Sequence, residues 1–250
     1  MRKNGLLGGV ICLLLLLPQP LWASEAQEII TKVVDNLDGK TAVLEFRMEV
    51  KTRRSKRTMT MESYSQGHDR SFVKILYPRK DAGITFLKVD KAMWQYVPRI
   101  EKVIKIPASM MLQSWMGSDF TNDDLVKESS LADDYESRLI SEDERSHLLE
   151  LIPRPEAPVV WGKIIMAVSR AHYLPEKVSY YDEEGGLVRE LYYREVRKFG
   201  SHFYPSSWQM IPRTPDKAGH ETNITVIKAT FDEPVDPAYF SKRALKRFSR

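Results

Sequence analysis

Residues 43–50 read VLEFRMEV, and from Leu44 onward apolar and polar side chains alternate. A period of two is typical of a β-strand that has one buried face and one face in water. The stretch therefore predicts a half-buried strand near the start of the chain, followed after the basic turn 51–57 by a second alternating strand with Met59 and Met61. The apolar face of the first strand carries Leu44, Phe46, Met48 and Val50.

More short stretches of this kind follow, separated by turn residues such as Pro78, Pro98 and the run 183–186. Many short strands joined by tight turns indicate a large antiparallel sheet that curls into a barrel or half-barrel. The predicted strands do not alternate with helices, so the sequence does not indicate a parallel sheet. We expect strands near 70–77, 83–89, 92–97, 101–106, 134–142, 146–152, 161–170, 202–211 and 221–231, and a long hairpin over 176–196.

Helices are predicted at both ends of this sheet-forming region. Residues 25–37, EAQEIITKVVDNL, place five apolar side chains at helical spacing, and Asp38-Gly39 ends the helix. A short basic helix is expected around 237–247. With so few helices, each one must cover the concave face of the sheet or leave that face open.

The start of the chain has the layout of a secretory signal peptide. Arg2 and Lys3 precede an apolar run over 5–17 and small residues around Ala23. The run is shorter than the ~20 residues of a membrane-spanning helix. We expect cleavage after Ala23, or alternatively after Ala26, which makes residues 1–23 the signal peptide and residues 24–250 a single domain in the periplasm.

Cys12 is the only cysteine and lies inside the expected signal peptide. It could instead be a lipid-attachment site, but Ile11 is a poor substitute for the small residue that such processing requires. Loss of the segment leaves a chain without disulfides, thiol nucleophiles or thiolate metal sites. Removing Arg2 and Lys3 also lowers the net charge from +4 to +2, which is too balanced for a nucleic-acid binder.

The middle of the chain, QSWMGSDFTNDDL over 113–125, is too apolar for a surface loop and too polar for a core helix. Gly117 can end a helix, and Thr121 with Asp124 fits a capping box that starts another helix at Asn122. We therefore expect a lid of two short helices; ordinary core packing is the alternative. Numerous methionines favour the lid, because flexible thioethers suit a ligand of variable shape. The expected lid residues are Met111, Leu112, Trp115 and Met116, at helical spacing after Pro107.

Little in the sequence indicates catalysis or a cofactor. The five histidines are isolated and show no metal-ligand spacing. Asp119, Asp123 and Asp124 lack the ligand order of a calcium-binding EF-hand, and Ser118 is not in a G-x-S-x-G elbow. We expect no metal, no cofactor and no enzymatic activity.

Four stretches resemble a known family. The run VDKAMWQYVP over 89–98 is similar to the D-x-x-x-W-x-Y-x-P hairpin of the LolA/LolB superfamily of periplasmic lipoprotein carriers. The stretches QSWMGSDFTNDDL, LPEKVSYYDEEGGLVR and AYFSKRALKRF are similar to the branch of outer-membrane lipoprotein-sorting proteins. The four stretches occur in order and span the expected mature chain.

The resemblance implies a strongly curved antiparallel half-barrel, with a few short helices covering the concave face and an apolar cavity for acyl chains. It also implies an inner-membrane transporter, of the ABC or RND type, that loads the carrier. The sequence departs from the family at the arginine of an early strand that holds the lid, for which Arg70 is the candidate here. The sequence lacks a lipobox, the motif for lipid attachment at a cysteine. In this respect it resembles the freely diffusing carrier of the family rather than the membrane-anchored receptor.

The sequence is thus interpreted as a monomeric periplasmic carrier that moves acyl chains of lipoproteins or lipids towards the outer membrane. A module that senses lipids or envelope stress is the alternative, and a small half-barrel enzyme is a third. The basic runs 53–57 and 242–250 are either solvated or in transient contact with anionic lipids or the transporter. Expected residues of the cavity are Leu44, Phe46, Met48, Met59, Met61, Trp94 and Tyr96.

Overall fold

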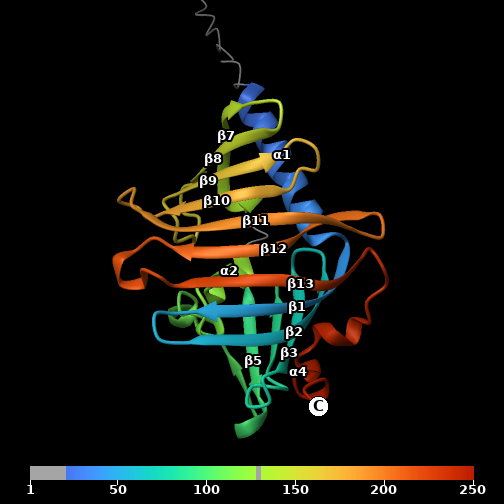
Figure 1. Ribbon diagram of the computed structural model, residues 1–250. Helices are drawn as coiled ribbons and strands as arrows, with labels where there is room; N and C mark the ends of the chain where they lie inside the picture. The colour runs from blue at the N-terminus through green and yellow to red at the C-terminus, as the bar shows by residue number, and fades with distance from the viewer. Residues whose placement is uncertain (1–20, 128–130) are drawn as a thin grey trace, which may run out of the picture.

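The computed structural model describes residues 21–127 and 131–250, and one antiparallel sheet of 13 strands forms its centre (Figure 1). The strand order is β6-β5-β4-β3-β2-β1-β13-β12-β11-β10-β9-β8-β7, so the first and last strands pair in the middle. The alternating sequence predicted a barrel or a half-barrel; the sheet curves without closing, which is the half-barrel that the family resemblance implied. The strands are β1 Thr41–Lys51, β2 Lys56–Gln66, β3 Arg70–Tyr77, β4 Thr85–Val89, β5 Ala92–Val97, β6 Lys102–Lys105, β7 Tyr135–Glu142, β8 Ser146–Pro153, β9 Lys163–Ser169, β10 Pro175–Tyr181, β11 Leu187–Phe199, β12 His202–Pro212 and β13 Glu221–Phe231.

The helices are short except for the first. No helix in the described ranges is both long and apolar enough to cross a bilayer. Residues 1–20 of the expected signal peptide lie outside the described residues. The helical elements are α1 Leu21–Asp38, η1 Pro98–Ile100, η2 Ala108–Met110, η3 Trp115–Gly117, α2 Asn122–Lys127, α3 Leu131–Asp134, η5 Pro215–Lys217, η6 Pro237–Phe240 and α4 Lys242–Arg247.

The two faces of the sheet carry separate apolar clusters. The larger one, here the inner cluster, joins Phe86 of β4 to Leu149 of β8, although these strands belong to opposite halves of the sheet. Because only the concave side of a curved sheet brings its two halves together, the inner cluster marks the concave face. Along β2 the alternation is visible directly, since Met59 and Met61 are fully buried in this cluster.

Helix α1 covers the concave face over the half of the sheet that runs from β7 to β12 (Figure 1). Its apolar stripe includes Ile29, Ile30, Val33 and Val34, all of them buried in the inner cluster. Full burial of such a side chain contributes about 1.5–3 kcal/mol. The helix is therefore held by its predicted amphipathic stripe.

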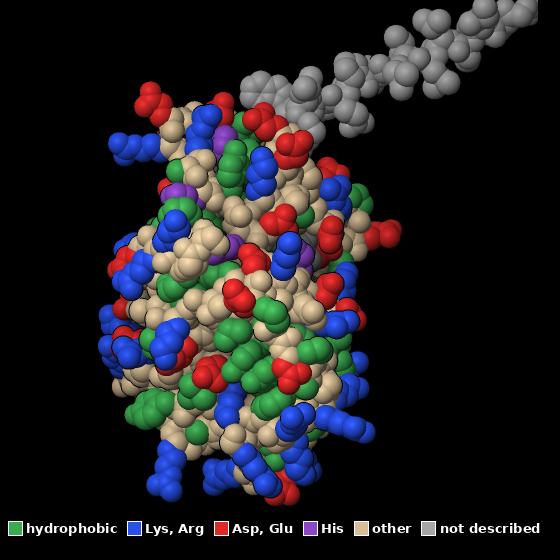
Figure 2. Space-filling model, turned by 90° about the vertical axis from the view of Figure 1, so that its right-hand side faces the viewer, with side chains coloured by type: hydrophobic (Ala, Val, Ile, Leu, Met, Phe, Trp, Pro, Cys, Tyr) green, Lys and Arg blue, Asp and Glu red, His purple; other side chains and the backbone are tan. Residues whose placement is uncertain are grey.

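The C-terminal residues pack on the opposite, convex face. There Phe72 and Leu87 form the outer cluster with Ala244 and Leu245 of α4. Thr85 Oγ1 donates a hydrogen bond of 2.7 Å to the carbonyl of Leu245, which fixes α4 to the sheet. Lys and Arg side chains gather at this lower end of the molecule (Figure 2), where Figure 1 shows β5, α4 and the C-terminus.

The predicted helix over 107–117 is wrong. The segment forms two separate 3-10 turns, η2 and η3, and between them Ser114 has a non-helical ψ of 121° and forms an isolated β-bridge with Thr121. Met116 and Gly117 both have left-handed backbone angles, with φ of +49° and +70°, which a continuous helix cannot contain. Helix α2 does begin at Asn122 as predicted.

Candidate functional site

An open cleft of about 810 Å³ lies beside the edge strand β6. This volume is within the range of ligand pockets, roughly 300–1,000 Å³. Its walls come from the end of β6, from the segment after it and from the loop before β9, and are mainly apolar. They include Ile106, Pro107, Met111, Leu112, Pro158 and Val160.

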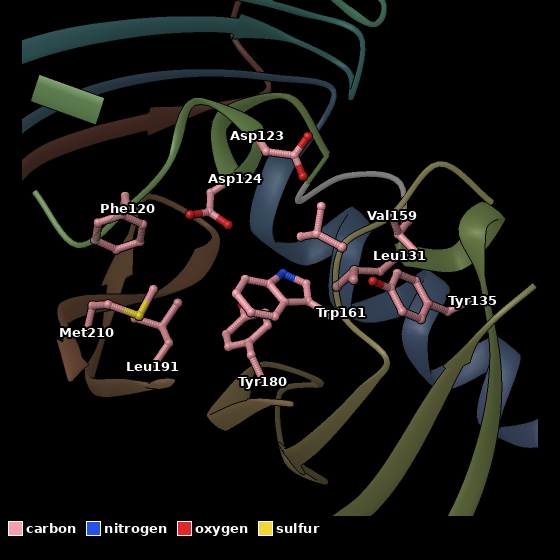
Figure 3. Close-up of a pocket in the computed structure, with 11 residues that line it drawn as sticks. Phe120, Asp123, Asp124, Leu131, Tyr135, Val159, Trp161, Tyr180, Leu191 and Met210 are labelled. Carbon is pink, nitrogen blue, oxygen red and sulfur yellow. The ribbon is translucent and has the colours of Figure 1, made fainter. Parts of the chain in front are cut away.

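A smaller cavity of about 40 Å³ adjoins the cleft. Asp123 and Val160 line both spaces and therefore form the partition between them. Such a volume has room for only a few water molecules. Figure 3 shows Trp161 at its centre, with Asp123 and Asp124 above it, Phe120, Leu191 and Met210 on one side, and Leu131, Val159 and Tyr135 on the other.

A second small cavity of about 70 Å³ lies beneath α1. Leu131 and Tyr180 line both small cavities and separate them, and Val33 and Val34 of α1 form part of the far wall. The three spaces thus lie in series from the cleft to the underside of α1. Two side chains separate the neighbouring spaces at each junction.

A buried ion pair holds α2 on the sheet. Both guanidinium Nη atoms of Arg189, on β11, bind the carboxylate of Asp124, with Nη1 2.7 Å from Oδ2. The Arg189 guanidinium also lies 4.4 Å from the ring centre of Trp161 and 4.5 Å from that of Tyr180. Arg189 is only 4% exposed, so the pair operates where water screens it least.

Asp124 also caps α2, as the sequence predicted. Its Oδ2 accepts a hydrogen bond of 2.7 Å from the Thr121 backbone N–H, and its own N–H donates to Thr121 Oγ1 at 3.2 Å. These reciprocal bonds form a capping box. One carboxylate therefore starts the helix and attaches it to β11, so a change at Asp124 affects both.

A second polar contact anchors the turn before α2. Thr222 Oγ1, on β13, donates a hydrogen bond of 2.8 Å to Asp119 Oδ2 and accepts one of 3.0 Å from the Asp119 N–H. Lys217 Nζ lies 3.7 Å from the other carboxylate oxygen. Residues 107–127, here the lid segment, are thus fixed at two points to the C-terminal half of the sheet.

The predicted lid residues do not act as one stripe. Trp115 is buried and packs edge-on against Phe86, with ring centres 5.3 Å apart. Met111 and Met116 are partly buried against the inner cluster. Leu112 is 57% exposed, beside the cleft. Because of the left-handed turn at 116–117, these side chains point in different directions.

Most of the predicted cavity residues on the first two strands face the concave side. Met48, Met59 and Met61 are fully buried in the inner cluster, and Phe46 packs against it. Leu44 pairs with Ser63 on the same face of β1 and β2; it is half-buried and lies outside both clusters. None of these residues borders the three spaces described above.

Trp94 and Tyr96 lie on the wrong face for the cavity. Both belong to the outer cluster, and Lys242 Nζ of α4 lies 4.7 Å from the ring centre of Trp94. Met93, the alternate residue of β5, is the one that enters the inner cluster. The prediction erred because aromatic side chains alternate with Met93 along β5, and alternation alone does not say which phase is inside.

The arginine that holds the lid segment is Arg189, which the sequence did not single out. Arg70 lies exposed at the start of β3 and pairs with Gln66 in the sheet register, whereas Arg189 binds Asp124. A signal was available, because Arg189, Leu191 and Tyr193 alternate on one face of a strand. An arginine on an apolar face needs a buried partner.

The site contains buried acidic and phenolic groups but no cluster of metal ligands. Burial raises the pKa of Tyr135 far above its ordinary value, and the carboxylates of Asp123 and Asp134 raise it further. Tyr135 therefore stays neutral in the cavity wall. In the ranges that the structure describes, no group of three or more His, Cys, Asp or Glu side chains could hold a metal ion.

The curved open sheet, the covering helices and the apolar path together define the LolA-like class of fold. The chain matches a family model described as "Uncharacterized protein" over residues 67–247 and belongs to that family. None of the curated proteins compared with the chain matches it.

Three solved structures share the fold. A DUF1329-family protein from Desulfovibrio piger is 22% identical, with a TM-score of 0.81 over 90% of this chain and 99% of that chain. An outer-membrane lipoprotein-sorting protein domain from Vibrio parahaemolyticus is 22% identical, with a TM-score of 0.78 over 90% and 100%. A LolA superfamily protein from Nitrosomonas europaea is 19% identical, with a TM-score of 0.71 over 88% and 98%.

Proposed function

We propose that the protein is a periplasmic carrier that binds the acyl chains of lipoproteins or lipids in the apolar path and moves them towards the outer membrane. The observation that supports this proposal is the series of three spaces, which leads from an open cleft to the underside of α1 and is interrupted by two side chains at each junction. The two small cavities correspond to the empty state. Cargo enters at the cleft and widens the path.

The energetics of an acyl chain explain why such a path is needed. Each CH₂ group exposed to water costs about 0.8 kcal/mol, so a tail of about sixteen carbons costs roughly 12 kcal/mol. An apolar path removes most of this cost. Because a bilayer offers a similar environment, transfer between bilayer and protein is nearly balanced, which allows both loading and release.

The lining of the concave face supports adaptation to a tail. Met48, Met59, Met61, Met166 and Met210 are each at most 2% exposed. Methionine has three flexible bonds and fills irregular gaps, so the cluster can rearrange when a tail displaces side chains. We propose that Phe46 and these methionines form the wall that a bound tail touches, with Trp115 and Met116 above it and Leu44 at the margin.

Opening the path requires a change at the lid segment. Asp123 and Val160 separate the cleft from the first cavity, and Asp123 precedes the residue that Arg189 binds. We propose that the Arg189–Asp124 pair breaks or shifts when cargo enters. The loading partner, an inner-membrane transporter of the ABC or RND type, and the extent of the domain, residues 24–250, are part of the same proposal and rest on the family resemblance.

Native mass spectrometry of the protein purified from its own host tests the proposal. We expect a co-purifying lipid or lipopeptide whose mass adds to that of the chain. An empty protein in complex with a signalling partner would instead support the sensor alternative. Turnover of a soluble metabolite would support the enzyme.

A substitution at the first junction tests the path itself. Val160→Trp places a large ring between the cleft and the first cavity, and we expect it to abolish uptake of a fluorescent fatty-acid probe. Val196→Trp is the matched control, because Val196 is 44% exposed on β11 and lies outside the three spaces. Equal uptake by both variants would show that acyl chains do not use this path.

A further inference from the structure

Three segments that are distant in the sequence meet at one end of the molecule. They are residues 77–83 after β3, residues 98–105 with η1 and β6, and residues 242–250, and together they are called the basic end. Ser249 Oγ donates a hydrogen bond of 2.7 Å to the carbonyl of Gly83. A Cβ atom on Gly83 would lie only 3.3 Å from Pro98 Cγ. All three segments are therefore in direct contact.

The basic end concentrates positive charge. It contains ten Lys and Arg residues against two acidic residues, Asp81 and Glu101, which gives a net charge of +8. The whole chain carries +4, so the remainder carries −4. All ten basic side chains are exposed, and none forms an ion pair within the described ranges. They are Arg79, Lys80, Arg99, Lys102, Lys105, Lys242, Arg243, Lys246, Arg247 and Arg250.

Large apolar side chains are exposed among these charges. Of 12 such side chains in the described part of the chain, four belong to the basic end. Ile100 at the β5–β6 turn is 52% exposed, and Tyr77 at the end of β3 is 57% exposed. Val103 and Ile104 on β6 are 45% and 40% exposed. The basic end therefore combines charge with apolar groups on turns and on an edge strand.

We infer that the basic end is a docking surface for an anionic lipid bilayer. Lysine and arginine bind anionic headgroups, each contributing about fivefold to partitioning, while aliphatic and aromatic side chains enter the boundary between headgroups and acyl chains. Nucleic acid fits less well, because exposed aliphatic side chains offer its bases no stacking surface. A charged protein partner would leave Ile100 and Tyr77 without an apolar environment.

The position of the basic end is consistent with this role. Lys105 belongs to the basic end and also lines the open cleft, so docking at this end brings the cleft to the bilayer surface. The inference goes beyond the proposed carrier function and does not depend on it, since charge and exposure alone carry it. A protein that docks on bilayers without binding a tail would satisfy the inference and contradict the carrier.

The second basic cluster of the chain, in the β1–β2 turn, is partly used within the fold. Arg53 Nε donates a hydrogen bond of 2.7 Å to the carbonyl of Ala218, and Lys56 Nζ lies 2.9 Å from Glu49. Of the other basic residues of the turn, Arg54 is exposed and Arg57 is half-buried. The β1–β2 turn therefore provides a weaker surface for a bilayer and a useful control region.

Co-sedimentation with vesicles tests the inference. We expect the wild-type protein to sediment with vesicles of phosphatidylethanolamine and phosphatidylglycerol, and to remain in solution with vesicles of phosphatidylcholine alone. The triple variant Lys80→Glu, Lys102→Glu, Lys246→Glu should reduce partitioning about a hundredfold. The control Lys40→Glu, Arg54→Glu, Arg145→Glu makes the same change in net charge at exposed sites elsewhere and should partition almost as the wild type does. All of these proteins keep the same N-terminal segment, so its contribution cancels.

A second variant separates docking from general electrostatic attraction. Ile100→Ser with Tyr77→Ser alters only exposed side chains and should weaken the binding that remains when salt screens the charges. The inference is overturned if wild type does not prefer the anionic vesicles, if both triple variants lose binding equally, or if the basic end retains an oligonucleotide more tightly than vesicles. Uptake of the fatty-acid probe, measured on the same variants, should stay at the wild-type level and so reports on the carrier separately.

Discussion

Arg189 lies against two neighbouring aromatic rings, those of Trp161 and Tyr180, with both of its terminal nitrogens on Asp124. A planar guanidinium suits this position, because it stacks on rings and binds a carboxylate with two parallel bonds. A lysine would reproduce the charge without either property. At the scale of single residues, this side chain connects β11 to the lid segment more directly than any apolar contact of the lid does.

Removal of Arg189 should therefore release the lid segment and destabilise the protein. We expect Arg189→Met to lower the free energy of unfolding by about 3–5 kcal/mol, because it leaves the Asp124 carboxylate buried without its partner. Chemical denaturation measures this change. Adding Asp124→Asn should recover part of the loss. The control is Arg138→Met, which breaks an exposed pair with Glu150 and should cost about 0–1 kcal/mol. Equal losses in the two variants would argue that the Arg189–Asp124 pair does not hold the lid segment.

At the scale of elements, the C-terminal end of α1 is attached to the β2–β3 turn through His68. Its Nδ1 lies 2.6 Å from Asp38 Oδ2, and its Nε2 lies 3.4 Å from Asp35 Oδ1. The hydrogen bond with Asp38, opposed in part by burial, raises the pKa of His68 above its ordinary value of 6.5. The protonated ring thus joins the helix that covers the second small cavity to the opposite half of the sheet.

This contact should make the stability of α1 depend on pH. A histidine with a raised pKa in the folded state stabilises fully below the unfolded pKa of 6.5, and this contribution disappears as the pH rises through the raised value. We expect the difference in unfolding free energy between wild type and His68→Ala to be largest below pH 6.5 and to shrink at higher pH. Thermal melts across this range measure it. A difference for His68→Ala that does not change with pH would refute the contact's role.

The attachment of the C-terminal residues depends on Gly83. Its φ is +81°, and a Cβ atom there would lie 2.6 Å from the carbonyl oxygen of Ser249. We expect Gly83→Ala to destabilise the protein by about 1–3 kcal/mol more than Gly185→Ala does. Gly185 is a matched control, because its φ is +84° but no atom lies within 4 Å of its added Cβ. Urea denaturation compares them, and limited proteolysis should show earlier cleavage near residue 242 in Gly83→Ala alone.

At the scale of the whole molecule, polar contacts hold the lid segment, and flexible methionine side chains fill the inner cluster. The sheet brings β1 and β13 together in its middle, so the C-terminal strands carry both anchors of the lid segment, Thr222 and Arg189. The cleft and the basic end lie at the edge strand β6. The cleft thus lies at one edge of the sheet, and the contacts that hold the lid segment lie near its centre.

Uptake of cargo should loosen the lid segment and leave the sheet intact. We expect amide hydrogen exchange of α2 and of residues 107–117 to accelerate when a long-chain fatty acid is bound, because the path widens beneath them. Exchange in β12 and β13 should not change. Saturating cargo should also raise the unfolding free energy by about 2.7 kcal/mol at a hundred times the dissociation constant. Slower exchange in α2 on loading would show that the tail binds elsewhere.

The sequence by itself determined the elements whose signal is local. Alternation in VLEFRMEV follows from the two-residue repeat of a strand, the stripe of α1 follows from helical periodicity, and the capping box of Thr121 and Asp124 spans only four residues. Each of these depends on backbone geometry that neighbouring residues set, so each could be predicted and was confirmed.

Only the tertiary structure decided which distant residues meet. Arg189 and Asp124 are 65 positions apart, and their pairing depends on the curvature of a sheet whose register no local pattern specifies. The same is true of Trp94 and Tyr96, which lie on the convex face because α4 covers them there. The three segments of the basic end likewise come together through the strand order. Periodicity fixes the two faces of a strand, whereas the packing of the whole chain selects which face is buried against what.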